Sequence, residues 1–191
     1  MANKSKFSEA DIIEAAFSVV REKGLAELST RSIAKQLCCS TMPIYSFFKS
    51  NKNLTKQIVD KAYQVLFEYQ TTRRTHDPFL DMGIGYVLFA KQERHLFRCI
   101  NDELHVDTMK KYNERHFDSL IIKLSEYPIV KGMSDAQIRR FFMQGWTYSH
   151  GLAQLINIGY FPGFEVSELC EWFVYTGKRY IKGTMDLHEP T

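Results

Sequence analysis

The chain has 191 residues, of which 45% are hydrophobic and 25% are charged, and its formal net charge is +3 at pH 7. These proportions lie near the average of globular proteins and exclude a disordered, fibrous or disulfide-stapled protein. At this length we expect a small module joined to a medium-sized one, with enough apolar material for a real core.

The positive charge is concentrated near the N-terminus. Residues 1–56 contain nine Lys or Arg against five Asp or Glu, whereas the remaining residues contain sixteen against seventeen. The net charge alone is too small to indicate a nucleic-acid partner, but a local excess of this kind attracts phosphates. The N-terminal segment is therefore the part of the chain to search for a DNA-binding motif.

The cysteines do not have the spacing of a disulfide framework. They are Cys38, Cys39, Cys99 and Cys170. No signal peptide precedes them, and no apolar run approaches the roughly 20 residues that a membrane span needs. We expect a cytoplasmic protein with reduced, structural thiols and no membrane contact. A redox switch or half a metal site at the adjacent pair stays open, although no second Cys or His pair lies at zinc-finger spacing.

A first helix is predicted over residues 9–23. Ser8 is a typical N-cap, and Asp11 follows it at the capping-box position. Apolar residues then recur at helical spacing as far as Lys23, and Gly24 is the residue best suited to the left-handed position after a helix.

Two short helices follow. Thr30 begins one over residues 30–37, and Ser40 opens another over residues 41–48 with Pro43 in its first turn, where a missing amide costs little. Helices this short need a core shared with the first helix, so we predict a three-helix unit containing a helix-turn-helix. Short helical pairs also occur in helical proteins that never bind nucleic acid, so the pattern alone leaves both interpretations open.

The rest of the chain is also predicted to be helical. Helix-start residues, Pro and Gly divide it into segments over residues 51–74, 77–92, 94–103, 107–126, 135–158 and 165–182. We find no period-two strand pattern, internal repeat or low-complexity tract. The expected fold is all-α, with about nine helices.

The segment LSTRSIAKQLCCSTMPIYSFFKSNKNL carries the most specific signal. Together with IIEAAFSVVREKGL before it, this segment resembles the DNA-binding domain of the TetR family of bacterial regulators over residues 9–58. The matching positions are Thr30-Arg31-x-Ile33-Ala34, Ser40, Ile44-Tyr45-x-x-Phe48-Lys49, Lys52 and Leu54. The resemblance implies a helix-turn-helix DNA-binding domain over residues 1–52 and a helical ligand-binding and dimerisation domain over residues 53–191.

Candidate DNA contacts fall into two groups. Thr30 and Ser40 stand at predicted helix N-termini, where hydroxyls and free amides meet phosphate oxygens, and the resemblance implies phosphate contacts at Tyr45, Lys49 and Lys52. Base reading is expected from Thr41, Met42 and Pro43, with Ser46 and Arg31 as further candidates. Because the start of this helix has no Arg, Asn or Gln, we expect apolar and shape-dependent readout.

Two positions depart from the family pattern. Cys38 stands in the turn where the family usually has Gly, which predicts a non-glycine residue at strained dihedral angles. Phe47 stands where His or Tyr is common, so a side-chain hydrogen bond to the backbone is expected to be missing.

The larger domain is predicted to form a homodimer. The resemblance implies that the last two helices form half of a four-helix bundle between subunits. Candidate interface residues are Gly145, Trp146, Gly151, Phe164, Leu169, Trp172, Phe173, Tyr175 and Tyr180. The alternative for these residues is core packing within one subunit.

The middle helices supply candidates for a ligand pocket. They are Met82, Tyr86, Phe89, Phe97, Tyr112, His116, Phe141, Trp146, Tyr148 and His150. Such a set suits a small hydrophobic or aromatic ligand whose identity is unknown, although ordinary core packing is the alternative for most of them. We expect no cofactor and no metal, because His95, His105 and His116 have no metal-ligand spacing.

We interpret the chain as a ligand-responsive transcriptional regulator, a repressor or less often an activator, whose dimer binds palindromic double-stranded DNA. It has no nucleophile elbow, phosphate-cradling glycine loop or paired-carboxylate motif, so we do not expect an enzyme. Two alternatives stay open. One is a DNA-binding regulator without a small-molecule effector, and the other is a helical enzyme or carrier.

Overall fold

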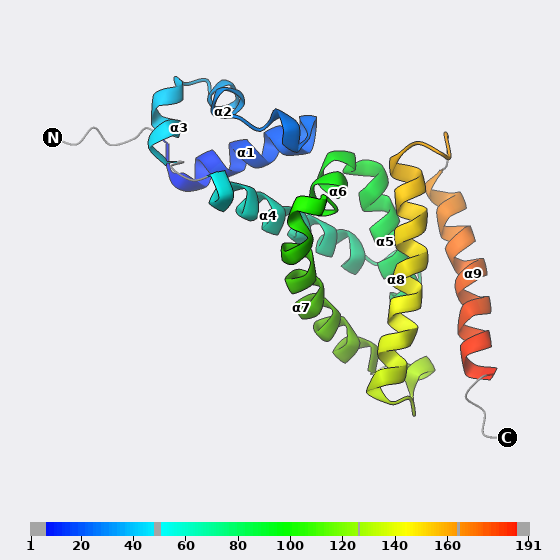
Figure 1. The fold of residues 1–191 in the computed structure, drawn as a ribbon. Coiled ribbons are helices and arrows are strands. Elements are labelled where there is room, and N and C mark those ends of the chain that lie inside the picture. The colour runs from blue at the N-terminus through cyan, green and yellow to red at the C-terminus, as the bar shows by residue number, and fades with distance from the viewer. Residues whose placement is uncertain (1–6, 48–50, 126, 164, 187–191) are drawn as a thin grey trace. The chain divides into compact units, whose positions relative to one another are not determined.

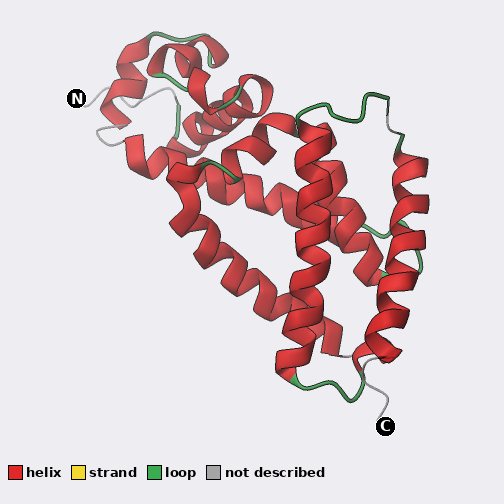
Figure 2. Ribbon diagram, turned by 45° about the vertical axis from the view of Figure 1, so that its right-hand side comes forward, coloured by secondary structure: helices red, strands yellow, loops and turns green. Residues whose placement is uncertain are grey.

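The structure is a computed structural model that describes residues 7–47, 51–125, 127–163 and 165–186. Over these ranges the chain is helical and contains no strand (Figures 1 and 2), which confirms the all-α prediction. The helices are α1 (Glu9–Lys23), α2 (Thr30–Gln36), α3 (Thr41–Phe47), α4 (Asn51–Thr71), α5 (Pro78–Gln92), α6 (Arg94–Ile100), α7 (Val106–Ser125), α8 (Asp135–Asn157) and α9 (Val166–Asp186). Short 3₁₀ turns lie at Leu25–Glu27, Glu103–His105 and Pro128–Val130.

Local capping explains where the first helix begins and ends. The amide of Asp11 donates to Ser8 Oγ at 3.2 Å, and the amide of Ser8 donates to Asp11 Oδ2 at 2.8 Å, which completes the predicted capping box. Bonds from the Ser8 side chain and amide hold the pKa of Asp11 below its usual value. Gly24 ends the helix with a φ of +92°, and its amide bonds to Val20 O.

Where the helix bounds differ from the prediction, side chains satisfy the backbone in another way. Residues 94–103 were predicted as one helix, but α6 ends at Ile100, because Asp102 accepts the amide of Leu104 and begins a 3₁₀ turn. The helix predicted to reach residue 74 ends at Thr71, because buried Asp81 accepts the amides of Arg74 and Thr75.

The chain divides into two compact units. One comprises Met1–Val65 with Glu93–Met109, and the other comprises Leu66–Gln92 with Lys110–Thr191. The chain therefore leaves the first unit, returns to it for α6 and leaves it again. These units are defined by contacts and not by function. The boundary between a DNA-binding and a ligand-binding domain at residues 52 and 53 therefore stays a prediction.

The first unit is built around α1. The buried faces of α1, α2, α3 and α4 supply its core, which consists of Ile12, Ala15, Ala16, Phe17, Val19, Val20, Ile33, Ala34, Ile44, Leu54, Ile58, Val59, Ala62 and Tyr63. Helix α6 packs against α1 and adds Leu96 and Phe97, both buried. An ion pair between Arg21 and Glu93 ties the two helices together, with Arg21 Nε donating to Glu93 Oε2 at 2.8 Å.

The second unit is built around α5. Nine of the fifteen residues of α5 are buried, and α8 and α9 both pack against it. Asp77 caps α5 by accepting the amides of Phe79 and Leu80 at 2.9 and 3.3 Å, and Pro78 occupies the first position of the helix. Among the residues that the structure describes, no helix is long and apolar enough to cross a bilayer.

Candidate nucleic-acid interface and ligand pocket

The turn between α2 and α3 is a Schellman motif with a cysteine at its left-handed position. The amide of Cys39 bonds to Ala34 O at 2.9 Å, and the amide of Cys38 bonds to Lys35 O at 3.2 Å. Cys38 has a φ of +50°, so the prediction of a non-glycine residue at strained dihedral angles is confirmed. The turn satisfies the last carbonyls of α2 and leads the chain directly into α3.

We expect Cys38→Gly to raise the free energy of unfolding by about 1 kcal/mol, because glycine adopts the left-handed conformation without steric cost. Cys38→Ala is the matched control, since it removes the thiol but keeps Cβ, and its stability should stay near that of the parent. Urea unfolding of the three proteins measures the difference. Equal stabilisation by both substitutions would assign the effect to the thiol instead of the backbone.

The start of α3 is anchored on one side and open on the other. Ile44 is fully buried, whereas Met42 is 79% exposed and Tyr45 is 73% exposed. Ser40 and Thr41 are exposed beside them, and Pro43 is half-buried. Two large side chains thus project from a helix of seven residues without any core to cover them.

Helix α2 contributes a basic side chain to the same unit. Arg31 is exposed, while Thr30, in the first turn of α2, is half-buried. The remaining candidate DNA contacts are the side chains of Ser46, Lys49 and Lys52, which lie outside the described residues, as does the side chain of Phe47. A short helix with exposed hydroxyl, thioether and phenol groups can present them to the edges and phosphates of a nucleic acid.

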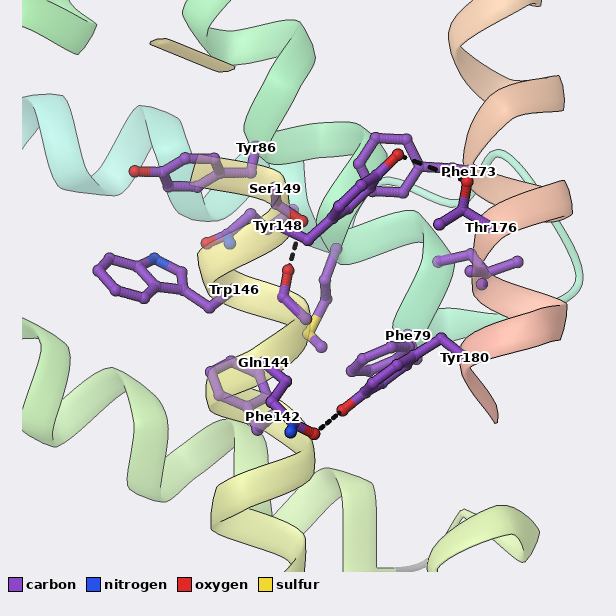
Figure 3. Close-up of a pocket in the computed structure, with 16 residues that line it drawn as sticks. Phe79, Tyr86, Phe142, Gln144, Trp146, Tyr148, Ser149, Phe173, Thr176 and Tyr180 are labelled. Carbon is purple, nitrogen blue, oxygen red and sulfur yellow. Dashed lines mark hydrogen bonds between the residues drawn. The ribbon is translucent and has the colours of Figure 1, made fainter. Parts of the chain in front are cut away.

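A cavity of about 130 Å³ lies in the second unit (Figure 3). Its walls come from α5, α8 and α9, with one residue from the end of α4. The lining residues are Gln70, Phe79, Leu80, Met82, Gly83, Tyr86, Phe142, Gln144, Gly145, Trp146, Tyr148, Ser149, Phe173, Thr176, Gly177 and Tyr180. The surface that they offer is largely aromatic, with neutral polar groups among the rings.

Three glycines allow the walls of this cavity to approach one another. A Cβ on Gly83 would lie 2.5 Å from Phe173 Cε1, and one on Gly145 would lie 2.6 Å from Phe79 Cζ. A Cβ on Gly177 would overlap the side chain of Leu80. Larger residues at these positions would push neighbouring side chains into the cavity, so its shape depends on the glycines.

Hydrogen bonds connect the helices around the cavity. Figure 3 shows the hydroxyl of Tyr148 on α8 reaching Thr176 Oγ1 on α9, at 3.4 Å, and the hydroxyl of Tyr180 on α9 reaching Gln144 on α8. The Tyr180 hydroxyl also lies 3.0 Å from the carbonyl oxygen of Phe141. These bonds cross between α8 and α9 and hold the polar side of the cavity in place.

His150 stands behind the cavity wall. Its Nδ1 lies 2.8 Å from the hydroxyl of Tyr86, and its ring stacks on Trp146 with centroids 5.2 Å apart. Burial lowers the pKa of His150. A neutral imidazole can accept the Tyr86 proton at Nδ1, whereas an imidazolium cannot.

We expect the stability of the protein to fall as the pH drops below about 6.5, the usual pKa of histidine in an unfolded chain. The folded pKa of His150 is lower, so between the two values the unfolded state binds the proton more readily. His150→Gln should flatten this part of the stability curve, as measured by urea unfolding at pH 7.5, 6.0 and 5.0. His76→Gln, at an exposed position, is the control and should leave the curve unchanged.

The structure brings four of the ten candidate pocket residues to the cavity. These are Met82, Tyr86, Trp146 and Tyr148, and His150 contacts two of them from behind. Phe89 and Phe141 are buried in side-chain packing and do not line the cavity, and Phe97 belongs to the first unit. Tyr112 on α7 is half-buried away from the lining, and the side chain of His116 lies outside the described residues.

Sequence patterns did not predict that the glycines, Phe79 and the α9 residues line this cavity. Aromatic residues on α9 were considered only for an interface, and glycines carry no chemistry that marks a pocket. The available sequence signal was the presence of a small residue among large ones on each of three helices. These small residues are Gly83 on α5, Ser149 on α8 and Gly177 on α9.

Several candidate interface residues lie inside the subunit. Leu169 and Phe173 are buried, and Gly145, expected to allow a partner helix to approach, faces Phe79 of α5. Trp146 and Tyr180 line the cavity, and Phe164 lies outside the described residues.

Other apolar residues of α8, α9 and the loop between them are exposed. Trp172 and Tyr175 on α9 are open to solvent, as are Ile158 and Tyr160 after α8. Gly151 is also exposed, with nothing within 4 Å of an added Cβ. This group is more apolar than a solvated surface needs to be, and it suits burial against another protein surface.

The thiols outside the turn are poor nucleophiles. Burial, with a smaller contribution from Asp102, raises the pKa of Cys99 to about 11, and burial raises that of Cys170. No group of three or more His, Cys, Asp or Glu side chains in the described part of the chain is arranged to hold a metal ion.

The fold and these two regions define a class of protein: a chain that is helical over its described residues, with a helix-turn-helix unit and a second helical unit that contains a partly open cavity. Comparison with solved structures makes the fold more specific. A TetR-like transcriptional regulator from Rhodococcus sp. RHA1 aligns with a TM-score of 0.64 and 15% identity over 92% of this chain and 96% of its own. The chain therefore has the TetR-like fold, which confirms the fold expected from the helix-turn-helix segment.

Two further structures agree. A protein of unknown function from Rhodococcus sp. RHA1 aligns with a TM-score of 0.69 and 17% identity over 95% of this chain and 98% of its own. A glutamine-to-alanine variant of TetR from Acinetobacter baumannii AYE, solved in complex with minocycline, has a TM-score of 0.61 and 15% identity over 97% and 100% of the two chains. No protein-family model matches the sequence. No curated protein matches it significantly.

Proposed function

We propose that this protein is a cytoplasmic transcriptional regulator that binds double-stranded DNA through α3. The observation that carries the proposal is the exposure of Met42 and Tyr45 on a helix anchored by fully buried Ile44. A recognition helix needs this arrangement, because its leading side chains must reach base edges while the opposite face holds the helix in place. Residues 1–52 are the proposed DNA-binding domain, and residues 53–191 are the proposed ligand-binding and dimerisation domain.

The proposed assembly is a homodimer on a palindromic operator. Two recognition helices about 34 to 36 Å apart, or a multiple of that distance, read two half-sites on one side of the duplex. Exposed Trp172, Tyr175 and Ile158 support an interface formed by α8 and α9. Of the interface residues proposed from the sequence, Trp172, Tyr175 and Gly151 keep this role.

The proposed regulation is release of DNA by a small molecule, which makes the protein a repressor. The cavity bounded by α5, α8 and α9 supports this part, as does the minocycline complex of a TetR variant with the same fold. Ligand would favour a conformer whose two recognition helices no longer fit successive grooves. Helix α4 has residues in both units, so it is the proposed carrier of the change.

Selection of bound sequences from random duplex DNA, with the full-length protein, tests the DNA-binding proposal. We expect enrichment of a symmetric consensus whose half-site spacing follows the helical repeat. Failure to enrich any sequence at low salt, where phosphate contacts are strongest, would reject the proposal. An asymmetric consensus with one half-site would reject the dimer.

A regulator without a small-molecule effector is the second candidate, because the cavity is small. Thermal unfolding in the presence of a compound library distinguishes the two candidates, since a ligand that binds the folded state raises the midpoint of unfolding.

A helical enzyme or carrier is the third candidate. It predicts that function survives substitution of Tyr45, because that exposed side chain then has no DNA partner.

A further inference from the structure

We propose that the cavity binds an uncharged molecule built on a single aromatic ring that carries a hydrogen-bond acceptor. The proposal rests on the ligand response proposed above and specifies the class of ligand. The absence of charged lining residues indicates a neutral ligand, the volume of the cavity indicates a single ring, and the hydrogen bonds around the cavity indicate an acceptor.

The absence of charge in the cavity wall excludes ions. None of the sixteen lining residues, all in the described part of the chain, is Asp, Glu, Lys, Arg or His. His150 contacts Tyr86 and Trp146 from behind the wall, and burial lowers its pKa, which disfavours its charged form. A charged ligand would lose its hydration without gaining an ion pair, so a neutral ligand is favoured.

The volume of about 130 Å³ sets the size. An apolar cavity of about 150 Å³ holds benzene, so this partly open cavity holds one ring with a small substituent, and a multi-ring compound would need rearrangement or would extend into solvent. Rings of Phe79, Tyr148 and Phe173 stand around the space, and Tyr148 meets Phe173 edge to face with centroids 5.7 Å apart. Aromatic walls of this kind favour a planar ring by stacking and edge contacts.

The hydroxyl groups that line the cavity indicate which substituent the ring of the ligand carries. Ser149 donates its hydrogen to Gly145 O at 2.9 Å, and Tyr148 donates to Thr176 Oγ1 at 3.4 Å. Thr176 accepts this bond, and no described residue accepts the hydrogen of its own hydroxyl. The Thr176 hydroxyl and the amide nitrogen of Gln144, whose oxygen accepts from Tyr180, are therefore donors at the cavity, and they call for a ligand acceptor such as a carbonyl oxygen.

Four small probes test the charge and the acceptor separately. Benzamide, benzoate, benzylamine and toluene share one ring and nearly one size but differ in charge and in hydrogen bonding. Calorimetric titration of the full-length protein, without DNA, should show saturable binding of benzamide. Benzoate and benzylamine, both charged at pH 7.5, should bind at least tenfold more weakly, and toluene should bind more weakly than benzamide but measurably.

Two matched variants test the donor. Thr176→Val keeps the shape and removes the hydroxyl, so benzamide should bind about five- to tenfold more weakly while toluene binding stays unchanged. Thr147→Val removes an exposed hydroxyl of α8 that bonds to Met143 O, and it should change neither affinity. Circular dichroism and thermal unfolding check that both variants are folded.

The proposal is overturned if benzoate or benzylamine binds as tightly as benzamide. It is also overturned if none of the four probes binds, or if Thr176→Val weakens benzamide and toluene equally. Binding of minocycline with an affinity above that of benzamide would equally reject the size limit. Each of these results leaves DNA binding untouched, whereas failure of the DNA selection leaves the probe results standing, so the two proposals fail separately.

Discussion

Tyr45→Ala is expected to weaken operator binding by roughly tenfold to a hundredfold for each DNA-contacting protomer. Tyr45 is 73% exposed on α3, and a hydroxyl bonded to a phosphate oxygen contributes about 1.5–3 kcal/mol. Its loss should leave folding intact, because Tyr45 is not part of the core of the first unit. Electrophoretic mobility shift or fluorescence anisotropy with the selected operator measures the change.

Leu104→Ala is the control for this experiment. Leu104 is 87% exposed in the 3₁₀ turn after α6, so its removal deletes an exposed apolar side chain outside both α3 and the proposed dimer interface. Operator affinity should not change. Loss of binding in both variants, or in neither, would show that Tyr45 does not contact DNA.

The salt dependence distinguishes an uncharged contact from a charged one. Tyr45→Ala should leave the slope of log affinity against log salt unchanged, because no cation is lost. Arg31→Ala removes an exposed cation on α2 and should reduce the slope by about 0.9 for each phosphate contact that disappears.

Gly85→Ala is expected to destabilise the protein by about 3 kcal/mol or more. Gly85 lies where α5 meets the end of α4. An added Cβ would overlap the carbonyl oxygen of Tyr69 and lie 2.6 Å from its carbonyl carbon and 2.8 Å from the Cα of Gln70. Backbone atoms cannot turn aside as a side chain can, so the two helices must separate. Urea unfolding at fixed protein concentration gives the difference in free energy.

Gly183→Ala is the control for this substitution. Gly183 lies near the end of α9 with nothing within 4 Å of an added Cβ, it is not among the residues proposed for the interface, and alanine is the better helix former. We expect no destabilisation. If Gly85→Ala were as well tolerated as Gly183→Ala, the close approach of α4 and α5 would be wrong.

The sequence by itself determined the helices and those of their ends that local capping fixes. Ser8, Gly24 and Asp77 act on amides and carbonyls within a few residues of themselves, so their effect can be predicted without knowing the fold. The left-handed φ of Cys38 was instead expected from the family resemblance, because the family usually has Gly at this position. Met42 and Tyr45 were expected to contact DNA, and both side chains are exposed.

Only the tertiary structure decided which residues meet across the second unit. Whether Gly145 faces a partner or Phe79, and whether Phe173 is interface or core, depends on how α8 and α9 are rotated about their axes against α5. Amphipathic patterns on long helices allow several rotations, because aromatic residues lie on more than one face. The cavity is the space that remains where α5, α8 and α9 pack together. Because its shape depends on all three helices, no local pattern in the sequence predicts it.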